Sequence, residues 1–355
     1  MPICGSMPIM GPIMGPAMGP TMGNERLVKP RILFVTEKWA ECDPSHGLSN
    51  VHHNFIGSFK SSGLGEADCF FFDETAHATK ERPDEHLIEH CRKKRADVIF
   101  LTMVRGTDLN PAAETLARIR SDLGIPIVSA YFDTTDAYAV QWIDAYAPAV
   151  DVNVIVDCYS NYAGNGAFPE KFLATWTPQD PALYLDKGAA RTIDVSFLGS
   201  AARYPDRKLA LGLLAEAGIE VRQGGGQIEG GLSPEDYAGI FRQSKITINF
   251  AAPALDGPGY QCKGRVFEAT LSGALLMEQA NPETEMWFTP GVHYVAFENE
   301  RDLADKIRHY LGHEDERARI AAAGSAHAHA NYTAGAFWRR VLERALPAFE
   351  LEASA

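Results

Sequence analysis

The sequence predicts an α/β protein with two doubly wound parallel sheets. Short apolar runs of strand length alternate with amphipathic runs of helix length, and this alternation stops and restarts near the middle of the chain. Some strand-like runs are apolar on both faces, such as ADVIFLTMV at 96–104, which is typical of parallel strands covered by helices on both sides. The length of 355 residues suits two domains of roughly 150 residues each.

The first half of the chain alternates strands and helices from its first apolar run onward. Each expected strand is a short run rich in β-branched or aromatic residues. These runs are 31–36, 67–72, 96–104, 125–132 and 152–156. Each expected helix has apolar residues at helical spacing or a residue that starts or ends a helix. These helices are 50–62 with Asn50 as N-cap, 83–94, and 111–123 before Gly124.

The alternation restarts after 177–190, a stretch with Pro and Asp that we interpret as a linker between domains. Ser233 and Pro234 predict a helix start, because Ser caps a first turn and Pro fits its first position. The other expected strands are 194–198, a run opening at 220–222, 245–250, 274–277 and 293–297. The other expected helices are 207–217, a segment within 261–273, 300–311, 314–330 and 334–349.

We therefore expect four segments: a tail (1–27), a first domain (28–180), a second domain (190–332) and a C-terminal helix (333–355). The tail contains the repeats GPIM, GPAM and GPTM, and Pro and Gly at this density predict disorder. It lacks the cationic start and the continuous apolar core of a secretory signal. A Met-rich site for Cu(I) is the alternative, because thioethers suit that ion.

The composition is that of a globular protein with an excess of acids. Hydrophobic residues make up 46% and charged residues 22%, and the net charge is −13. An acidic chain disfavours nucleic-acid binding, which depends on Lys and Arg. None of the six cysteines forms a C-x-x-C pair, so a zinc or redox motif is not indicated. With no apolar run of about 18 residues to span a membrane, we expect a cytoplasmic protein.

The most informative motif is QCKGRVFEATLSG at 261–273, which places charged residues around a helix start. Free backbone N–H groups and the helix dipole favour anions there, and Lys263 and Arg265 add positive charge. Glu268, one turn into the helix, is placed to reach a ribose hydroxyl. The motif suggests a nucleotide-sugar site. The alternative from these residues alone is an ordinary strand–helix unit with solvated charges.

Four motifs of the second half resemble the C-terminal domain of GT-B glycosyltransferases, in the group-1 branch that includes spore-maturation-type proteins. In chain order they are VSFLGSAARYPDR, SPEDYAGIFRQSKITINF, KGRVFEATLSGALLMEQ and PETEMWFTPGVHYVAFENERDLADKIRHYL, within 193–331. The first half resembles these enzymes more weakly, through Asp133 and Asp136 after a strand.

This resemblance implies two Rossmann-like domains facing each other, with C-terminal helices packing across, and a nucleotide-sugar donor bound in the cleft, mainly to the second domain. It implies no required metal and no cofactor. Glu268 matches the acid that contacts the donor ribose, and Lys263 and Arg265 stand where donor-phosphate contacts are expected. The remaining donor-binding candidates are Gly199, Ser200 and Arg203 on the loop that faces the diphosphate, and Asn249 at a strand end.

One position departs from the family pattern and leaves the stereochemistry open. Many retaining relatives carry a second Glu eight positions before the ribose acid, where this chain has Tyr260. Inversion needs a base that takes the acceptor proton. His46 is the first candidate, with Asp43 in the same loop as its substitute and Asp133 to orient the ring.

Other interpretations of these residues remain open. A single His is more often an ordinary surface or core residue than a base, and neighbouring His52 and His53 would lie on different helix faces. Asp133 and Asp136 are also placed to cap a helix from residue 135 onward.

The favoured function is a metal-independent glycosyltransferase that moves a sugar from a nucleotide-diphosphate sugar to an unidentified protein, glycan or small molecule. The alternatives are a non-catalytic nucleotide- or sugar-binding protein and a nucleotide-sugar epimerase or hydrolase of the same fold. An NAD oxidoreductase is disfavoured, because the Gly-rich stretches do not form G-x-G-x-x-G followed by the ribose acid.

Overall fold

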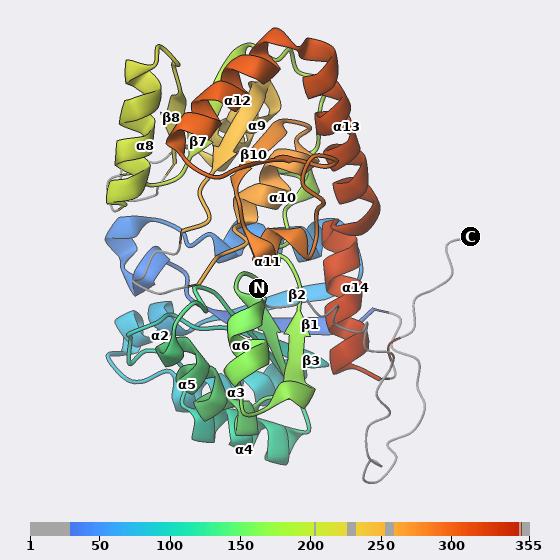
Figure 1. Cartoon of the computed structure of the whole chain (residues 1–355). Helices are drawn as coiled ribbons and strands as arrows, with labels where there is room; N and C mark the ends of the chain where they lie inside the picture. The colour runs from blue at the N-terminus through green and yellow to red at the C-terminus, as the bar shows by residue number, and fades with distance from the viewer. Residues whose placement is uncertain (1–28, 202–203, 226–231, 253–258, 348, 350–355) are drawn as a thin grey trace, which may run out of the picture.

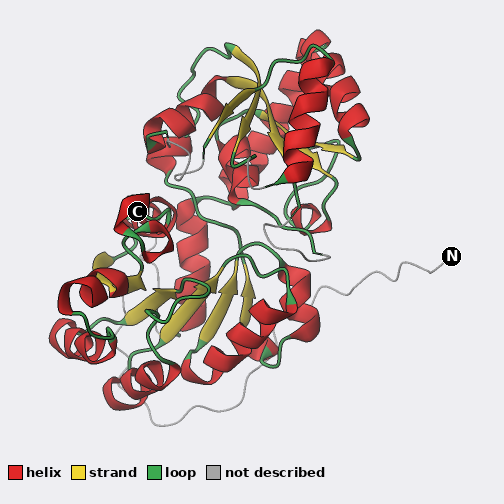
Figure 2. Ribbon diagram, turned by 90° about the vertical axis from the view of Figure 1, so that its left-hand side faces the viewer, coloured by secondary structure: helices red, strands yellow, loops and turns green. Residues whose placement is uncertain are grey.

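The computed structural model describes residues 29–201, 204–225, 232–252, 259–347 and 349, so the expected tail lies outside the described residues. Two parallel sheets lie one above the other, each flanked by helices, and the α/β prediction with two Rossmann-like units is confirmed (Figures 1 and 2). The first sheet has the order β2-β1-β3-β4-β5-β6 and the second β11-β10-β9-β7-β8. Both orders reverse direction part-way, as in doubly wound folds.

The first sheet is built from the apolar runs of the first half. Its strands are β1 (Arg31–Thr36), β2 (Glu66–Phe71), β3 (Val98–Thr102), β4 (Ile127–Tyr131), β5 (Val152–Ile155) and β6 (Phe172–Ala174). Every residue of β3, β4 and β5 is buried, and Ile99 pairs with Ile127 in register. Burial on both faces explains why these runs lack polar alternation.

In the described part of the first half, the first sheet is flanked by six α-helices, of which α2 and α6 were not expected from the sequence. The six are α1 (Ser58–Ser62) after a π-helical segment (His52–Gly57), α2 (Phe72–Thr79), α3 (Asp84–Lys94), α4 (Ala113–Leu123), α5 (Ala137–Tyr146) and α6 (Tyr159–Asn165). The helices α2 and α6 are too short to show a clear period. The π-helical segment has Val51 and not the expected Asn50 at its N-cap position, and no side chain caps it. Just before it, the Ser49 hydroxyl accepts from the Val51 N–H at 3.3 Å.

The second sheet follows the expected restart of the alternation. Its strands are β7 (Ile193–Leu198), β8 (Arg222–Gly224), β9 (Ser244–Asn249), β10 (Leu275–Gln279) and β11 (Val295–Phe297). Its helices are α8 (Pro205–Glu216), α9 (Pro234–Gln243), α10 (Gly264–Leu271), α11 (Pro282–Glu285), α12 (Glu300–Gly312) and α13 (Glu314–Asn331). The cap of α9 forms as expected, since Ser233 Oγ accepts from the Asp236 N–H at 3.1 Å.

The expected linker contains one short helix, α7 (Pro181–Tyr184). The strands of the first sheet lie within 28–180 and those of the second within 190–332, although the exact limits of the domains stay a prediction. In the part of the chain that the structure describes, no helix is long and apolar enough to cross a membrane.

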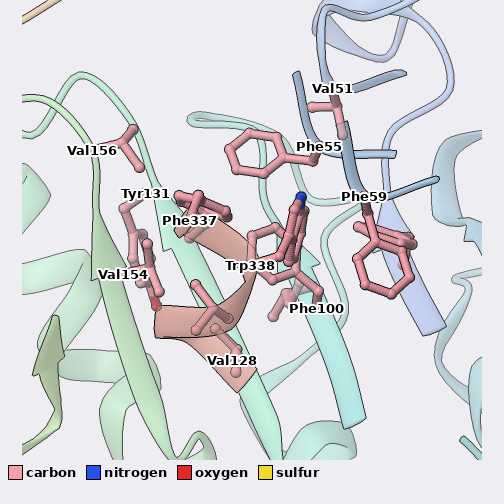
Figure 3. Packing of buried hydrophobic residues seen from close by; sticks show 14 of the residues in the cluster. Val51, Phe55, Phe59, Phe100, Val128, Tyr131, Val154, Val156, Phe337 and Trp338 are labelled. Carbon is pink, nitrogen blue, oxygen red and sulfur yellow. The ribbon is translucent and has the colours of Figure 1, made fainter. Parts of the chain in front are cut away.

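The last helix, α14 (Ala334–Ala345), returns to the first sheet, as Figure 1 shows. Trp338 is fully buried, with its ring centroid 4.9 Å from that of Phe100 and 5.1 Å from that of Phe59 (Figure 3). Its indole N–H donates to Ser58 Oγ at 3.0 Å. The apolar face of α14 therefore packs onto the first half of the chain, which confirms the expectation that the C-terminal helices pack across.

A second set of contacts fixes the two halves together beside the ends of β4 and β5. The Trp176 ring lies 5.7 Å from that of Trp287 and 5.1 Å from that of Tyr332. The Glu283 carboxylate accepts from the N–H of Tyr159 at 2.8 Å and also bonds to Ser160, so an acid of α11 caps the start of α6. Helix α6 therefore forms where a partner from the other half completes its first turn.

Candidate functional site

The carboxyl ends of the two sheets face each other, and residues from both meet there. The amide of Gln261, after β9, donates to Asp133 Oδ1 at 2.6 Å and to Asp157 Oδ2 at 2.9 Å. These acids follow β4 and β5 of the first sheet. Ligands of open α/β sheets bind at such carboxyl ends, so we take this edge as the candidate site.

Arg265 is held rigidly at the start of α10. Its Nη1 donates to the Leu198 carbonyl at 2.6 Å and its Nε to Asn249 Oδ1 at 2.8 Å. Asn249 in turn donates to Glu278 Oε2 at 2.7 Å, so Asn249 positions Arg265. Gly199 has φ 155°, and its missing side chain leaves the space that the Arg265 guanidinium occupies.

Two further cations lie beside Arg265. The guanidinium of Arg207, on the first turn of α8, is 3.4 Å from the Tyr204 ring centroid, and Lys263 Nζ is 6.0 Å from the same centroid. Arg207 is 3% exposed and donates to the carbonyls of Ser200 and Ala252, while its Nε is buried without a partner. We call Arg207, Lys263 and Arg265 the cation cluster.

The cation cluster makes no salt bridge among the described residues. Lys263 Nζ donates to Gln261 Oε1 at 2.6 Å, and the other hydrogen bonds of the cluster also end on neutral oxygens. Carboxylates lie nearby without pairing: the charges of Asp133 and Asp157 act on Lys263, and the charge of Arg265 acts on Glu268 and Glu278. Burial, followed by the charges of Arg265 and Arg207, lowers the pKa of Lys263 to about 7. Buried positive charge without a partner is costly, so the site favours a bound anion.

The start of α10 strengthens this preference for an anion. Lys263 is its N-cap residue and makes no side-chain capping hydrogen bond. An uncapped helix start carries partial positive charge and backbone donors suited to phosphate.

Glu268 lies in the same helix but is enclosed. It accepts from the hydroxyls of Tyr184 at 3.3 Å and Tyr237 at 3.2 Å. Burial raises its pKa to about 7, against the opposing charge of Arg265. The structure thus places Glu268 next to the cation cluster with both carboxylate oxygens bonded to tyrosines.

Asp133 is the acid that reaches the C-terminal side from the first sheet. Its φ of 51° is left-handed, which is uncommon for a residue other than glycine and tends to mark functional sites. Its charge is near enough to Lys263 to raise the pKa of that lysine. Asp157 beside it is buried, and burial and the charge of Asp133 raise the pKa of Asp157.

The other base candidates lie in the loop after β1 and contact neighbouring residues of that loop. Asp43 accepts from the Ser45 N–H at 2.8 Å and hydroxyl at 2.7 Å, and these bonds lower its pKa. His46 Nδ1 lies 3.5 Å from Glu41 Oε2 in the same loop. Glu37 was not foreseen: burial raises its pKa to about 7, and one of its buried oxygens has no partner.

Other expected residues have structural partners or lie outside the described part. Asp136 caps α5 by accepting from the Ala139 N–H at 2.8 Å, as the alternative interpretation expected. The His52 ring stacks on Phe71 with centroids 5.1 Å apart, and burial lowers its pKa and that of His53. Arg203 lies outside the described residues.

Sequence reasoning missed Arg207, Asp157 and Gln261 as site residues. Arg207 was within a quoted motif, VSFLGSAARYPDR, but its neighbour Arg203 was chosen. Gln261 opens the motif at 261–273 but was given no role there, and Asp157 gave no local signal, because the two meet across 104 residues of chain. Within the described ranges, no three His, Cys, Asp or Glu side chains gather in a way that suits a metal ion.

Comparisons with known proteins agree with this architecture. Residues 185–343 match the family described as glycosyl transferase-like. The structure of HepE from Anabaena in complex with UDP is similar, with a TM-score of 0.55 and 12% identity, covering 88% of this chain and 98% of that one. The chain has the GT-B fold.

Two other structures support the same fold. A glycosyltransferase from Rickettsia africae has a TM-score of 0.58 and 10% identity, covering 90% of this chain and 98% of that one. Sucrose-phosphate synthase from Thermosynechococcus elongatus has a TM-score of 0.60 and 12% identity, covering 90% and 100%. No curated protein sequence matches the chain.

Proposed function

We propose that this protein is a glycosyltransferase that binds a nucleoside-diphosphate sugar between the two sheets and transfers the sugar to an acceptor held by the N-terminal half. The observation that carries the proposal is the cation cluster, whose three side chains have no carboxylate partner among the described residues. A diphosphate supplies the missing negative charge. The similar HepE structures, which contain UDP and UDP-glucose, support the choice of ligand.

In this proposal the cation cluster acts on the leaving group. Negative charge grows on the diphosphate as the bond to the sugar breaks, and fixed cations stabilise that charge most in the transition state. Arg265 offers a planar fork that is already held in place by Leu198 and Asn249. Lys263 and Arg207 add charge from the sides. The mechanism makes no use of a metal.

We place the donor ribose near Glu268, as the family resemblance implies. Because both oxygens of Glu268 bond to Tyr184 and Tyr237, contact with the ribose requires one tyrosine hydroxyl to turn aside or to bridge. Burial keeps this carboxyl ready to bond a hydroxyl, because a pKa of about 7 leaves both protonation states accessible near neutral pH.

If the reaction inverts the sugar, we assign the base to Asp133 in preference to His46 and Asp43. Among the described residues, Asp133 accepts one hydrogen bond, from Gln261, and it lies near Lys263 of the cation cluster. His46 and Asp43 bond within their own loop. A base must reach the acceptor hydroxyl directly or through one water, and Asp133 is closest to where donor and acceptor meet.

The test combines donor binding with product analysis. UDP titrated into the protein should release heat and raise the melting temperature by binding the folded state only. Incubation of UDP-glucose and other UDP-sugars with acceptor mixtures should then yield glycosylated product. Binding without any turnover would support the non-catalytic alternative, and sugar products formed without acceptor would support the epimerase or hydrolase. No binding of UDP, GDP or ADP at millimolar concentration would contradict the proposal.

A further inference from the structure

The loop between β4 and α5 carries polar and aromatic groups that the donor site does not use. Thr135 is 3% exposed, yet its Oγ1 has no hydrogen-bond partner among the described residues. Two residues after Asp136, the side chain of Tyr138 is 49% exposed on the first turn of α5. Asn161 holds the loop in place by donating to the carbonyls of Thr134 and Asp136.

Arg105, from the loop after β3, packs against the Tyr138 ring and holds it in place. Its guanidinium carbon lies 4.4 Å from the Tyr138 ring centroid. Its two terminal nitrogens donate to Asp136 at 3.2 and 2.6 Å, so the guanidinium is fixed by both contacts. The pair leaves little net charge, while a large part of the tyrosine ring stays open to solvent.

A second exposed aromatic residue approaches from the C-terminal half. Tyr260 is 44% exposed and follows Gly259. A side-chain carbon at Gly259 would lie 3.3 Å from the Thr135 carbonyl oxygen and 3.6 Å from Cys158 Sγ. This close approach puts Tyr260 at the same edge as Thr135. The next residue, Gln261, bonds to Asp133, so this edge adjoins the donor site.

We propose that Tyr138, Tyr260 and the Arg105–Asp136 pair form the acceptor site, and that the acceptor is a neutral carbohydrate whose ring stacks on Tyr138. This inference rests on the proposed function and specifies its second substrate. A pyranose has apolar C–H faces and a rim of hydroxyls. The faces suit an exposed aromatic ring, and the hydroxyls suit a fixed guanidinium and a carboxylate.

The charges at this edge argue for a neutral ligand. Among the described residues of this edge, Arg105 is paired with Asp136, and Asp133 and Asp157 add negative charge. An anionic sugar would therefore meet like charge, which disfavours it. The cation cluster does not offset this, because the donor diphosphate neutralises it.

The test measures binding of cellobiose, maltose, lactose and N,N′-diacetylchitobiose to the full chain saturated with UDP, by calorimetry or saturation-transfer NMR. Sorbitol, an open-chain polyol, and glucuronic acid, an anionic sugar, are the comparison ligands. At least one disaccharide should bind, and more tightly than either comparison ligand. Failure of all four while UDP binds overturns this inference and leaves the proposed function standing, whereas failure of UDP contradicts the proposed function.

Variants of Tyr138 separate ring stacking from an indirect effect. Tyr138→Ala should weaken the disaccharide by about tenfold, the worth of a good aromatic contact, with UDP affinity and melting temperature unchanged. Tyr138→Phe keeps the ring and should bind within about threefold of the parent. Leu209→Ala, on the exposed face of α8, is the remote control. Equal binding by the parent and Tyr138→Ala, or tighter binding of tyrosine-rich peptides than of any disaccharide, would overturn the inference.

Discussion

The carboxyl ends of the two sheets face each other, and the charged side chains at these two edges are bonded in opposite ways. On the C-terminal edge, Arg207, Lys263 and Arg265 bond only to neutral oxygens among the described residues. On the N-terminal edge, Asp43 and Asp136 bond to donors within their own half. The cations of the C-terminal edge are therefore available to pair with a ligand, whereas the acids of the N-terminal edge stabilise the loops that carry them.

This difference indicates how each substrate is recognised. A charged donor is drawn to cations that have no salt-bridge partner, whereas an acceptor on the other edge depends on stacking and on hydrogen bonds to charged groups that already form a pair. Asp133 and Asp157 differ from the other acids of the N-terminal edge, because both accept from Gln261 of the other half.

The largest effect is expected from Asp133→Asn, which keeps the shape and the hydrogen bond to Gln261 but removes the base. For an inverting reaction, kcat should fall by about 10²–10⁴-fold, the usual contribution of a positioned base, while UDP affinity stays within a few-fold. Single-turnover kinetics with saturating donor measures this. His46→Ala is the comparison variant and should retain kcat within a few-fold. The reverse outcome would move the base to the β1 loop, and retained configuration in the product would exclude both.

Arg265→Ala should lower kcat/KM by about 10²–10³-fold, the range found when one fixed donor to a developing oxyanion is removed. Lys263→Ala should cost less, because a lysine offers a point charge and no planar fork. Arg265→Lys separates charge from geometry. Steady-state kinetics across donor concentrations gives all three values. Turnover of Arg265→Ala within a few-fold of the parent would remove this residue from the donor site.

Donor binding should take up a proton above about pH 7. The pKa of Lys263 is about 7 in the free protein, and a bound diphosphate raises it, so UDP affinity should fall by up to about tenfold per pH unit above 7. Calorimetry in two buffers of different ionisation enthalpy counts the protons. Lys263→Arg should bind without uptake. A pH-independent UDP affinity from pH 7 to 9 would contradict the prediction.

The pH dependence of folding stability has the opposite sign to that of UDP affinity. Between about pH 7 and 10.5, the unfolded chain holds a proton on this lysine that the folded protein lacks, so raising the pH should stabilise the UDP-free protein through this group. Comparison of the melting temperatures of the parent and Lys263→Met over this range isolates the contribution.

The smallest effect is expected where the two halves are fixed together. Glu283→Ala removes the acid that caps α6 and should lower the free energy of unfolding by about 1–2 kcal/mol, as for other caps. Glu285→Ala, on the same helix but exposed, should be neutral. UDP affinity should be unchanged in both, because Glu283 bonds to the start of α6 and to none of the three side chains of the cation cluster. Urea unfolding and UDP titration check the two statements, and a large loss of UDP binding would show that the edges are not independent.

The sequence by itself determined the local features of this protein. Apolar runs specify buried parallel strands, and Ser233 and Pro234 specify the start of α9. Lys263 and Arg265 lie together because only one residue stands between them at the start of α10. These features depend on neighbours in the chain, so periodicity and capping rules suffice to find them.

Only the tertiary structure decided which charges are paired. Arg207 joins Lys263 from another helix, Gln261 reaches Asp133 across 128 residues, and two tyrosines enclose Glu268. The same lysine is an ordinary surface charge or a group with a pKa of about 7 depending on whether it is buried beside other cations. Burial and partners, which arise from packing distant segments together, set the free energy of each charge, and the spacing of residues along a chain does not contain that information.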